Sequence, residues 1–198
     1  MLRRSIIAIV AIALTACAAS TIDPQRKASI GFVYVEPVQL SKASVFGPNL
    51  SEAEASSGKV PATVSEAESR LQQVVDARTN LRELIEGQAK QDLISKGYHV
   101  TDTASGASAQ LKINVYHALS VPVGANDGRG IAMTVSAEMV RSSDGKRLMF
   151  AGESQIKDSE TKGVRMAPYA EWFTNDDFLV EQYRLVARLL TAQALAGL

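Results

Sequence analysis

Two Ser-x-x-Lys spacings supply the side chains that could act as nucleophile and base in this sequence. Serine enzymes that transfer acyl groups use this spacing because residues i and i+3 share one face of a helix. Ser154 and Lys157 instead follow an alternation typical of a strand, which would place their side chains on opposite faces. Ser56 and Lys59 lie in a segment without periodicity. We therefore expect no catalytic residues, and a hydrolase that uses Ser154 and Lys157 is the enzymatic alternative.

Metal and phosphate sites have equally little support. His99 and His117 lack the accompanying His or Cys cluster that a metal site needs, so we expect no metal ligands. His117 should face inward and bond to backbone or water. The segment "GANDGRG" at 124–130 lacks the Walker lysine and the Gly-x-Gly-x-x-G spacing, and it joins two predicted strands. It is typical of a hairpin loop, and we expect no cofactor-binding residues.

Cys17 is the only cysteine of the 198 residues. It follows two arginines, Arg3 and Arg4, and the apolar run Ile6 to Leu14, which is the plan of a secretory signal peptide. The run is too short to span a bilayer, which needs about 20 apolar residues. The thiol is the one soft nucleophile in the chain that could form a thioether.

The four residues "LTAC" from Leu14 to Cys17 resemble the lipobox of bacterial lipoprotein precursors. This resemblance implies a diacylglyceryl group on the Cys17 sulfur, a palmitate or similar chain, and removal of residues 1–16 as a lipoprotein signal peptide. Two or three chains give stable membrane anchoring. Ala18, where some lipoproteins carry aspartate, favours the outer membrane, with the domain facing the periplasm. The alternative is a lone buried cysteine beside an ordinary signal peptide.

Charge and cysteine content exclude several functions. Loss of residues 1–16 would remove two of the 21 basic residues and none of the 21 acidic ones, which leaves a net charge of about −2. A chain without excess positive charge is a poor partner for phosphate backbones, so we expect no nucleic-acid binding. Once Cys17 is lipidated, neither a disulfide nor a redox pair is possible.

Composition also predicts the domain boundaries. Residues 17–28 are small and polar with a proline, and predict a flexible tether. Residues 29–198 are enough for a single α/β domain in the periplasm. Within them, the stretch at about 41–62 carries prolines and glycines without sustained periodicity, which predicts a long loop.

Hydrophobic periodicity predicts the elements of this domain. Residues 30–38 are almost continuously apolar, which predicts a strand covered on both faces. A helix should begin at Asn80, capped with Glu83, and end at Gly97, after an earlier helix that begins at Ser65. A short strand and three longer ones follow, the last two joined by an Asp-Gly turn, and a final helix should begin after Thr174. We therefore predict an α+β fold with a mixed, largely antiparallel sheet and two main helices packed on one face.

An aromatic cluster precedes the final helix. Tyr169 and Trp172 are the candidate contacts for a partner, because aromatic side chains anchor many interfaces. The alternative is a hydrophobic staple in which Phe173 packs on Phe178 and fixes the entry of the helix.

Residues 76–118 contain an Arg-x-Asn-Leu-Arg helix start, a Lys-Gly-Tyr helix end and a loop into an alternating strand. This order resembles the centre of the YajG-type bacterial lipoproteins. More broadly it is similar to auxiliary lipoproteins of ABC-type transporters and to the N-terminal domain of TolB. The resemblance implies an envelope lipoprotein and no catalytic residues.

Together these features predict a non-enzymatic, lipid-anchored protein of the outer membrane that binds another envelope protein. The alternative is a periplasmic accessory lipoprotein of an ABC-type lipid or solute transporter.

Overall fold

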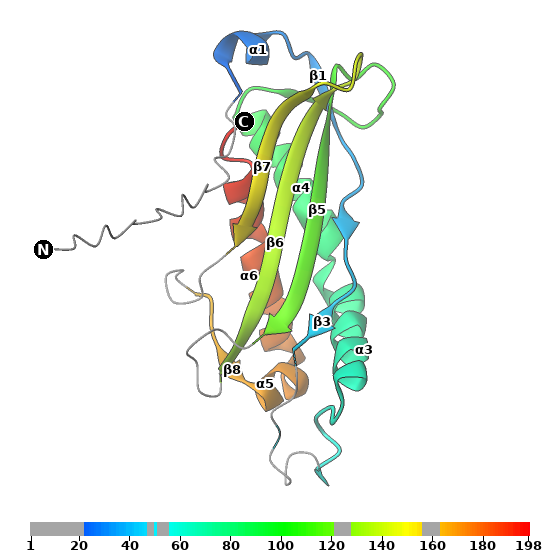
Figure 1. Ribbon diagram of the computed structural model, residues 1–198, viewed down its shortest axis with the longest axis vertical. Coiled ribbons are helices and arrows are strands. Elements are labelled where there is room, and N and C mark those ends of the chain that lie inside the picture. Colours follow the sequence, from blue (N-terminus) through cyan, green and yellow to red (C-terminus); the bar gives the residue numbers. More distant parts are fainter. Residues whose placement is uncertain (1–21, 47–49, 51–55, 121–127, 156–162) are drawn as a thin grey trace, which may run out of the picture.

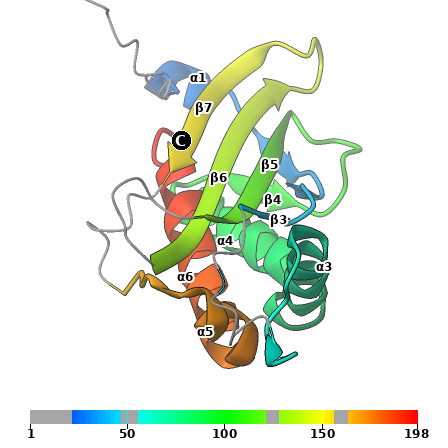
Figure 2. The ribbon, with the colours of Figure 1, turned by 60° about the horizontal axis from the view of Figure 1, so that its bottom comes forward.

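The computed structural model of the protein describes residues 22–46, 50, 56–120, 128–155 and 163–198. They form an α+β fold in which the main helices lie against one face of a mixed sheet, as predicted (Figure 1). Figure 2 shows the same two layers from another side, with α4 and α6 behind the long strands. Among the described residues, no helix combines the length and apolarity that crossing a membrane requires.

Five of the eight described strands form the main path of the sheet, in the spatial order β4-β1-β5-β6-β7. Their bounds are β1 Phe32–Val35, β4 His99–Thr101, β5 Ala109–Ser120, β6 Gly128–Arg141 and β7 Arg147–Gln155. β1 runs parallel to both β4 and β5, whereas β5, β6 and β7 are antiparallel neighbours. The predicted hairpin of β6 and β7 is confirmed, with Gly145 at a φ of 67° in its turn.

Three short strands extend the sheet. β2 Gln39–Leu40 and β3 Ser44–Val45 continue the parallel pairing along β5, and β8 Ala167–Pro168 pairs with the start of β6. β3 therefore lies inside the stretch at about 41–62 that the sequence predicts as a long loop. Residues 47–49 and 51–55 of that stretch lie outside the described residues.

The prediction that residues 30–38 form a strand covered on both faces is wrong. Only Phe32–Val35 are in β1, and the exposed fraction alternates from 53% at Phe32 to 0% at Val33. Pro37, which has no backbone N–H to donate, follows the strand closely. One apolar face of β1 is thus buried under the helices and the other is accessible.

The helical layer consists of α3 Val64–Val74, the π-helix η1 Val75–Thr79, α4 Leu81–Ser95, α5 Tyr169–Thr174 and α6 Asp176–Ala194. The helical spacing of apolar residues in this segment predicts a buried stripe of Leu81, Leu84, Ile85, Ala89 and Leu93. In α4 four of these side chains are buried and Leu84 is partly buried beside them. Gly97 follows α4 at a φ of 84°, as a C′ glycine should.

Two predicted helix starts are wrong by one or two residues. The capping box of α3 joins Thr63 and Glu66, two residues before the predicted start at Ser65. Helix α6 is capped by the side chain of Asn175, which accepts from the backbone N–H of Phe178, while the Thr174 hydroxyl donates to Ala170 O. Both shifts have one cause, since several oxygen-bearing side chains precede each helix and the entry of the backbone decides which one reaches the free N–H groups.

The described part of the predicted tether is folded. Asp23 caps the short helix α1 Pro24–Ala28, and Pro24 occupies its first turn. Ile22 is 8% exposed, and its N–H donates to Gly197 O at 3.1 Å. The tether prediction is therefore wrong from Ile22 onward, because one apolar side chain and one hydrogen bond fix this segment beside the C-terminus.

Candidate functional site

The aromatic residues predicted as partner contacts are part of the core. Trp172 is 0% and Tyr169 4% exposed. The Trp172 Nε1–H donates to Arg129 O at 3.1 Å and to Ala167 O at 3.2 Å, and the Tyr169 hydroxyl donates to Pro61 O. The ring of Trp172 packs against that of Phe178 at a tilted angle of 53°, with ring centroids 4.7 Å apart, while the Phe173 ring packs against Tyr169. The packing that fixes α5 also covers both side chains, so neither Tyr169 nor Trp172 lies on the surface of this structure.

Arg129 completes this buried cluster at the start of β6. Its guanidinium lies over the Tyr169 ring, 4.7 Å from the centroid, and donates to the carbonyl oxygen of Phe46. Burial lowers the pKa of Arg129. These contacts join β6 to α5 and to the end of β3, so the cluster is a structural junction.

The two histidines lie apart. His117 is buried, and its Nε2 lies 3.1 Å from Ser41 O while its Nδ1 lies 3.3 Å from the Tyr183 hydroxyl. A carbonyl oxygen only accepts, so Nε2 carries the proton and Nδ1 accepts from Tyr183. The prediction of an inward-facing, backbone-bonded His117 is confirmed. His99 is exposed at the edge strand β4, beside Phe32.

The other sequence candidates give no site that can be described. The backbone of Ser154 pairs with Val135 in the sheet. Lys157, Cys17 and residues 124–127 lie outside the described residues. Across the described ranges, no three His, Cys, Asp or Glu side chains gather closely enough to hold a metal ion.

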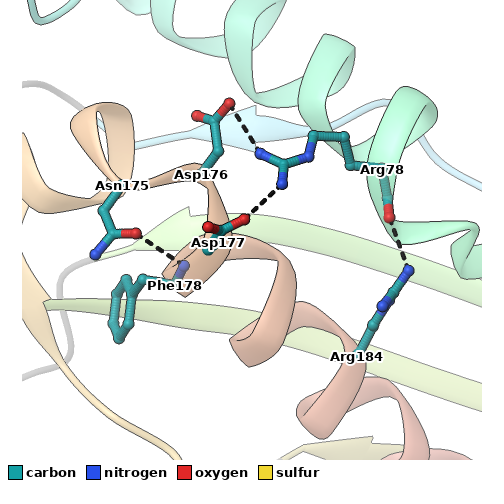
Figure 3. A network of polar contacts seen from close by, with 6 residues as sticks. All are labelled: Arg78, Asn175, Asp176, Asp177, Phe178 and Arg184. Carbon is teal, nitrogen blue, oxygen red and sulfur yellow. Dashed lines mark hydrogen bonds and ion pairs between the residues drawn. The ribbon is translucent and has the colours of Figure 1, made fainter.

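An ionic network joins the two helical segments that the sequence treats separately (Figure 3). The Arg78 guanidinium in η1 contacts Asp176 at 3.3 Å and Asp177 at 2.5 Å, both in the first turn of α6. The hydrogen bond from Asp177 raises the pKa of Arg78. Arg184, two turns further along α6, donates to the carbonyl oxygens of Arg78 and Thr79 at 2.9 and 3.2 Å.

The backbone at this junction is unusual. π-Helical turns are rare and occur often at functional sites. Asn80, directly after η1, has a φ of 48° and is the one residue other than glycine with a positive φ among those described. Its side chain makes no capping hydrogen bond, so the predicted Asn80 and Glu83 cap is wrong. The left-handed residue turns the chain from η1 into α4, and Asn tolerates that conformation better than most residues.

A groove, which we call the α4–α6 groove, runs from this junction between the two helices. One hollow of about 580 Å³ is lined by Arg78, Asp177, Val180, Glu181, Arg184, Leu185 and Arg188. A second of about 550 Å³ shares Arg184 and Arg188 and adds the exposed side of α4, including Gly87 and Gln91. A Cβ placed on Gly87 would meet no atom within 4 Å. The groove is thus open, rich in arginine on its α6 side, and without a side chain at Gly87.

Sequence reasoning missed the α4–α6 groove because its residues share no motif. Arg78, Arg184 and Arg188 are spread over 111 positions and meet only through the packing of α4 on α6. The one available signal was the spacing of Arg184 and Arg188, which lie four residues apart on the same helix face.

The sequence matches no known protein-family model and no curated protein. Its fold is similar to that of lipoprotein GNA1162 from Neisseria meningitidis, at 14% identity and a TM-score of 0.37, over 64% of this chain and 81% of that one. It is also similar to PelC from Paraburkholderia phytofirmans, crystallised as a dodecamer, at 13% identity and a TM-score of 0.40, over 84% and 87% of the two chains. For XCC0632 from Xanthomonas campestris the identity is 11%, the TM-score 0.42 and the coverage 85% of each. Similarities at this level leave the family open, and membership of the YajG-type lipoproteins stays a prediction.

Proposed function

We propose that this protein is a lipid-anchored, non-enzymatic component of the bacterial cell envelope that binds another envelope protein. The observation that carries this proposal is the position of Ile22, which enters the fold five residues after Cys17 and is fixed beside Gly197. The lipobox-like residues before Cys17 mark its sulfur for attachment of the lipid. Ala18 favours the outer membrane, with the domain in the periplasm.

The short distance between Cys17 and Ile22 orients the domain. Five residues span at most about 18 Å when fully extended. The end of the fold that carries α1 and the C-terminus therefore stays next to the bilayer (Figure 1). α3 and α5 lie at the opposite end and reach furthest from the membrane.

The α4–α6 groove is the surface that we assign to the partner. It holds Arg188, which makes no hydrogen bond or ion pair with any described residue, beside Arg184, whose guanidinium is fixed by two carbonyl oxygens. Glu83 and Asp177 on its rim add negative charge. A partner segment with a carboxylate aimed at Arg188 fits this pattern, because charge-assisted pairs to arginine give both orientation and specificity.

Two experiments test the proposal. The first compares membrane and soluble fractions of cells that carry the natural chain or Cys17→Ser, and we expect the natural chain in the outer-membrane fraction and the variant released from it. A natural chain found in the soluble fraction would remove the lipid anchor from the account.

The second experiment places a photo-crosslinking amino acid at position 91, in the α4–α6 groove, and at position 70 on α3 as a control. We expect an envelope protein to be captured from position 91 alone, and Gly87→Leu to reduce that capture by filling the groove. Capture of an inner-membrane permease would instead favour the accessory subunit of an ABC-type transporter. Equal capture from both positions would show that the groove is not the binding surface.

A further inference from the structure

The sheet face opposite the main helices carries partly or fully exposed side chains along β5, β6 and β7. Along β5 and β6 the side chains alternate, and Leu111, Ile113, Val135 and Ala137 are buried toward α4 and α6. The other set points away from the helices, and it includes Lys112, Asn114, Tyr116, Thr134, Ser136 and Glu138. Tyr116 is 62% exposed there, and Phe150 on β7 is 37% exposed. We call this surface the open face.

Charged side chains cross the open face in strictly alternating order. Glu36 lies beside β5, with its carboxylate 3.8 Å from the Lys112 ammonium. Lys112 on β5 is the direct cross-strand neighbour of Glu138 on β6. Glu138 in turn accepts from the Arg147 Nε of β7 at 2.6 Å. The row therefore carries negative, positive, negative and positive charge from one side of the sheet to the other.

We propose that the open face binds the open face of a second copy of this chain. A two-fold axis that lies between the two faces and runs along the strands reverses the order of the row. Lys112 then meets Glu138 of the second copy, and Glu36 meets Arg147, so all four contacts are between opposite charges. A two-fold axis across the strands would leave the order unchanged and place like charges together, which opposes association.

The lipid anchor selects the same axis, and in this respect the inference rests on the proposed function. An axis along the strands keeps both α1 ends at one end of the dimer, so both Cys17 residues can enter one membrane. An axis across the strands would place the anchors at opposite ends. Two sheets packed face to face usually keep their strands within about 30° of each other, which agrees with this arrangement.

The remaining rows of the open face also suit a second copy. The same axis places Tyr116 opposite Thr134 and Asn114 opposite Ser136, since each pair consists of cross-strand neighbours on β5 and β6. Four strands spaced about 4.8 Å apart, over about 27 Å from residue 110 to residue 118, give roughly 500 Å² on each copy. The total of about 1,000 Å² reaches the lower bound of a specific interface.

Two opposite charge reversals test this symmetry. Lys112→Glu places glutamate against Glu138 of the second copy, and Glu138→Lys places lysine against Lys112, so each variant alone should dimerise at least about tenfold more weakly than the natural chain. An equal mixture of the two restores four pairs of opposite charge and should form the heterodimer. The readout is the mass of the full chain by sedimentation in detergent, with Arg82→Glu at an exposed position of α4 as the control that leaves the dimer unchanged.

Recovery on mixing is the expected result, because a variant that misfolds cannot be rescued by a second one. A natural chain that sediments as a monomer, single variants that dimerise normally, or a mixture that stays monomeric would each overturn the inference. The same preparation tests the dimer and the proposed lipid anchor independently. A dimer without lipid on Cys17 would remove the anchor alone, and a lipidated monomer would remove the dimer alone.

Discussion

The Arg184 guanidinium lies 2.9 Å from the main-chain carbonyl oxygen of Arg78 and so closes the end of the π-helix η1. Helix ends leave carbonyl groups without partners, and a cation there is favourable. We expect Arg184→Ala to lower the free energy of unfolding by about 1–2 kcal/mol, since it removes two hydrogen bonds from a charged donor. Urea unfolding of the natural chain and of Arg184→Ala measures this difference in free energy. Arg188→Ala is the matched control and should change stability by less than about 0.5 kcal/mol.

Trp172→Ala tests whether the aromatic cluster is core. The side chain is fully buried and its Nε1–H bonds to two carbonyl oxygens. We expect a loss of about 3–5 kcal/mol in the free energy of unfolding. Trp172→Phe keeps most of the packing and should cost less. If Trp172→Ala left the unfolding midpoint unchanged, the cluster would not have the packing described.

The sequence predicts the elements of this fold better than their ends. Alternation along β5 and the stripe of α4 depend on one buried face each, so local spacing is enough to find them. By sequence, Trp172 is only a candidate partner contact, because an aromatic residue before a helix has the same local pattern whether it docks a partner or fills the core. Its burial depends on Arg129 and Ala167, which no spacing in the sequence brings together.

The candidate site was beyond sequence reasoning for the same reason. η1 continues α3 without a break in composition, and its contacts with α6 join segments about a hundred residues apart. The alternating charge order of Glu36, Lys112, Glu138 and Arg147 likewise appears only once the strand register is known.

His117 should make stability depend on pH. Burial lowers the pKa of His117 below its ordinary value of 6.5, against a smaller opposite effect of the hydrogen bond to Ser41. As pH falls through 6.5 the unfolded chain takes up this proton first, so the folded state loses stability between 6.5 and the lower folded pKa. We expect urea midpoints to fall over that range and to fall less in His117→Gln. His99→Gln, at an exposed position, is the control and should keep the full dependence.

Gly87 tests whether the α4–α6 groove is open at this position. Its backbone is helical and a Cβ there meets no atom, so Gly87→Ala should raise the free energy of unfolding by about 0.5–1 kcal/mol. Gly97→Ala, at a φ of 84°, should instead lower it by about 1 kcal/mol. A destabilised Gly87→Ala would mean that other atoms fill the α4–α6 groove at this point.

The most direct test of the account is the mass of the N-terminal peptide of the protein extracted from its native membrane. The account predicts a chain that begins at Cys17, with a diacylglyceryl group on its sulfur, and a Cys17→Ser protein that lacks the group. A peptide that begins elsewhere, or one that contains unmodified Cys17, would contradict the lipid anchor and the orientation of the domain that depends on it.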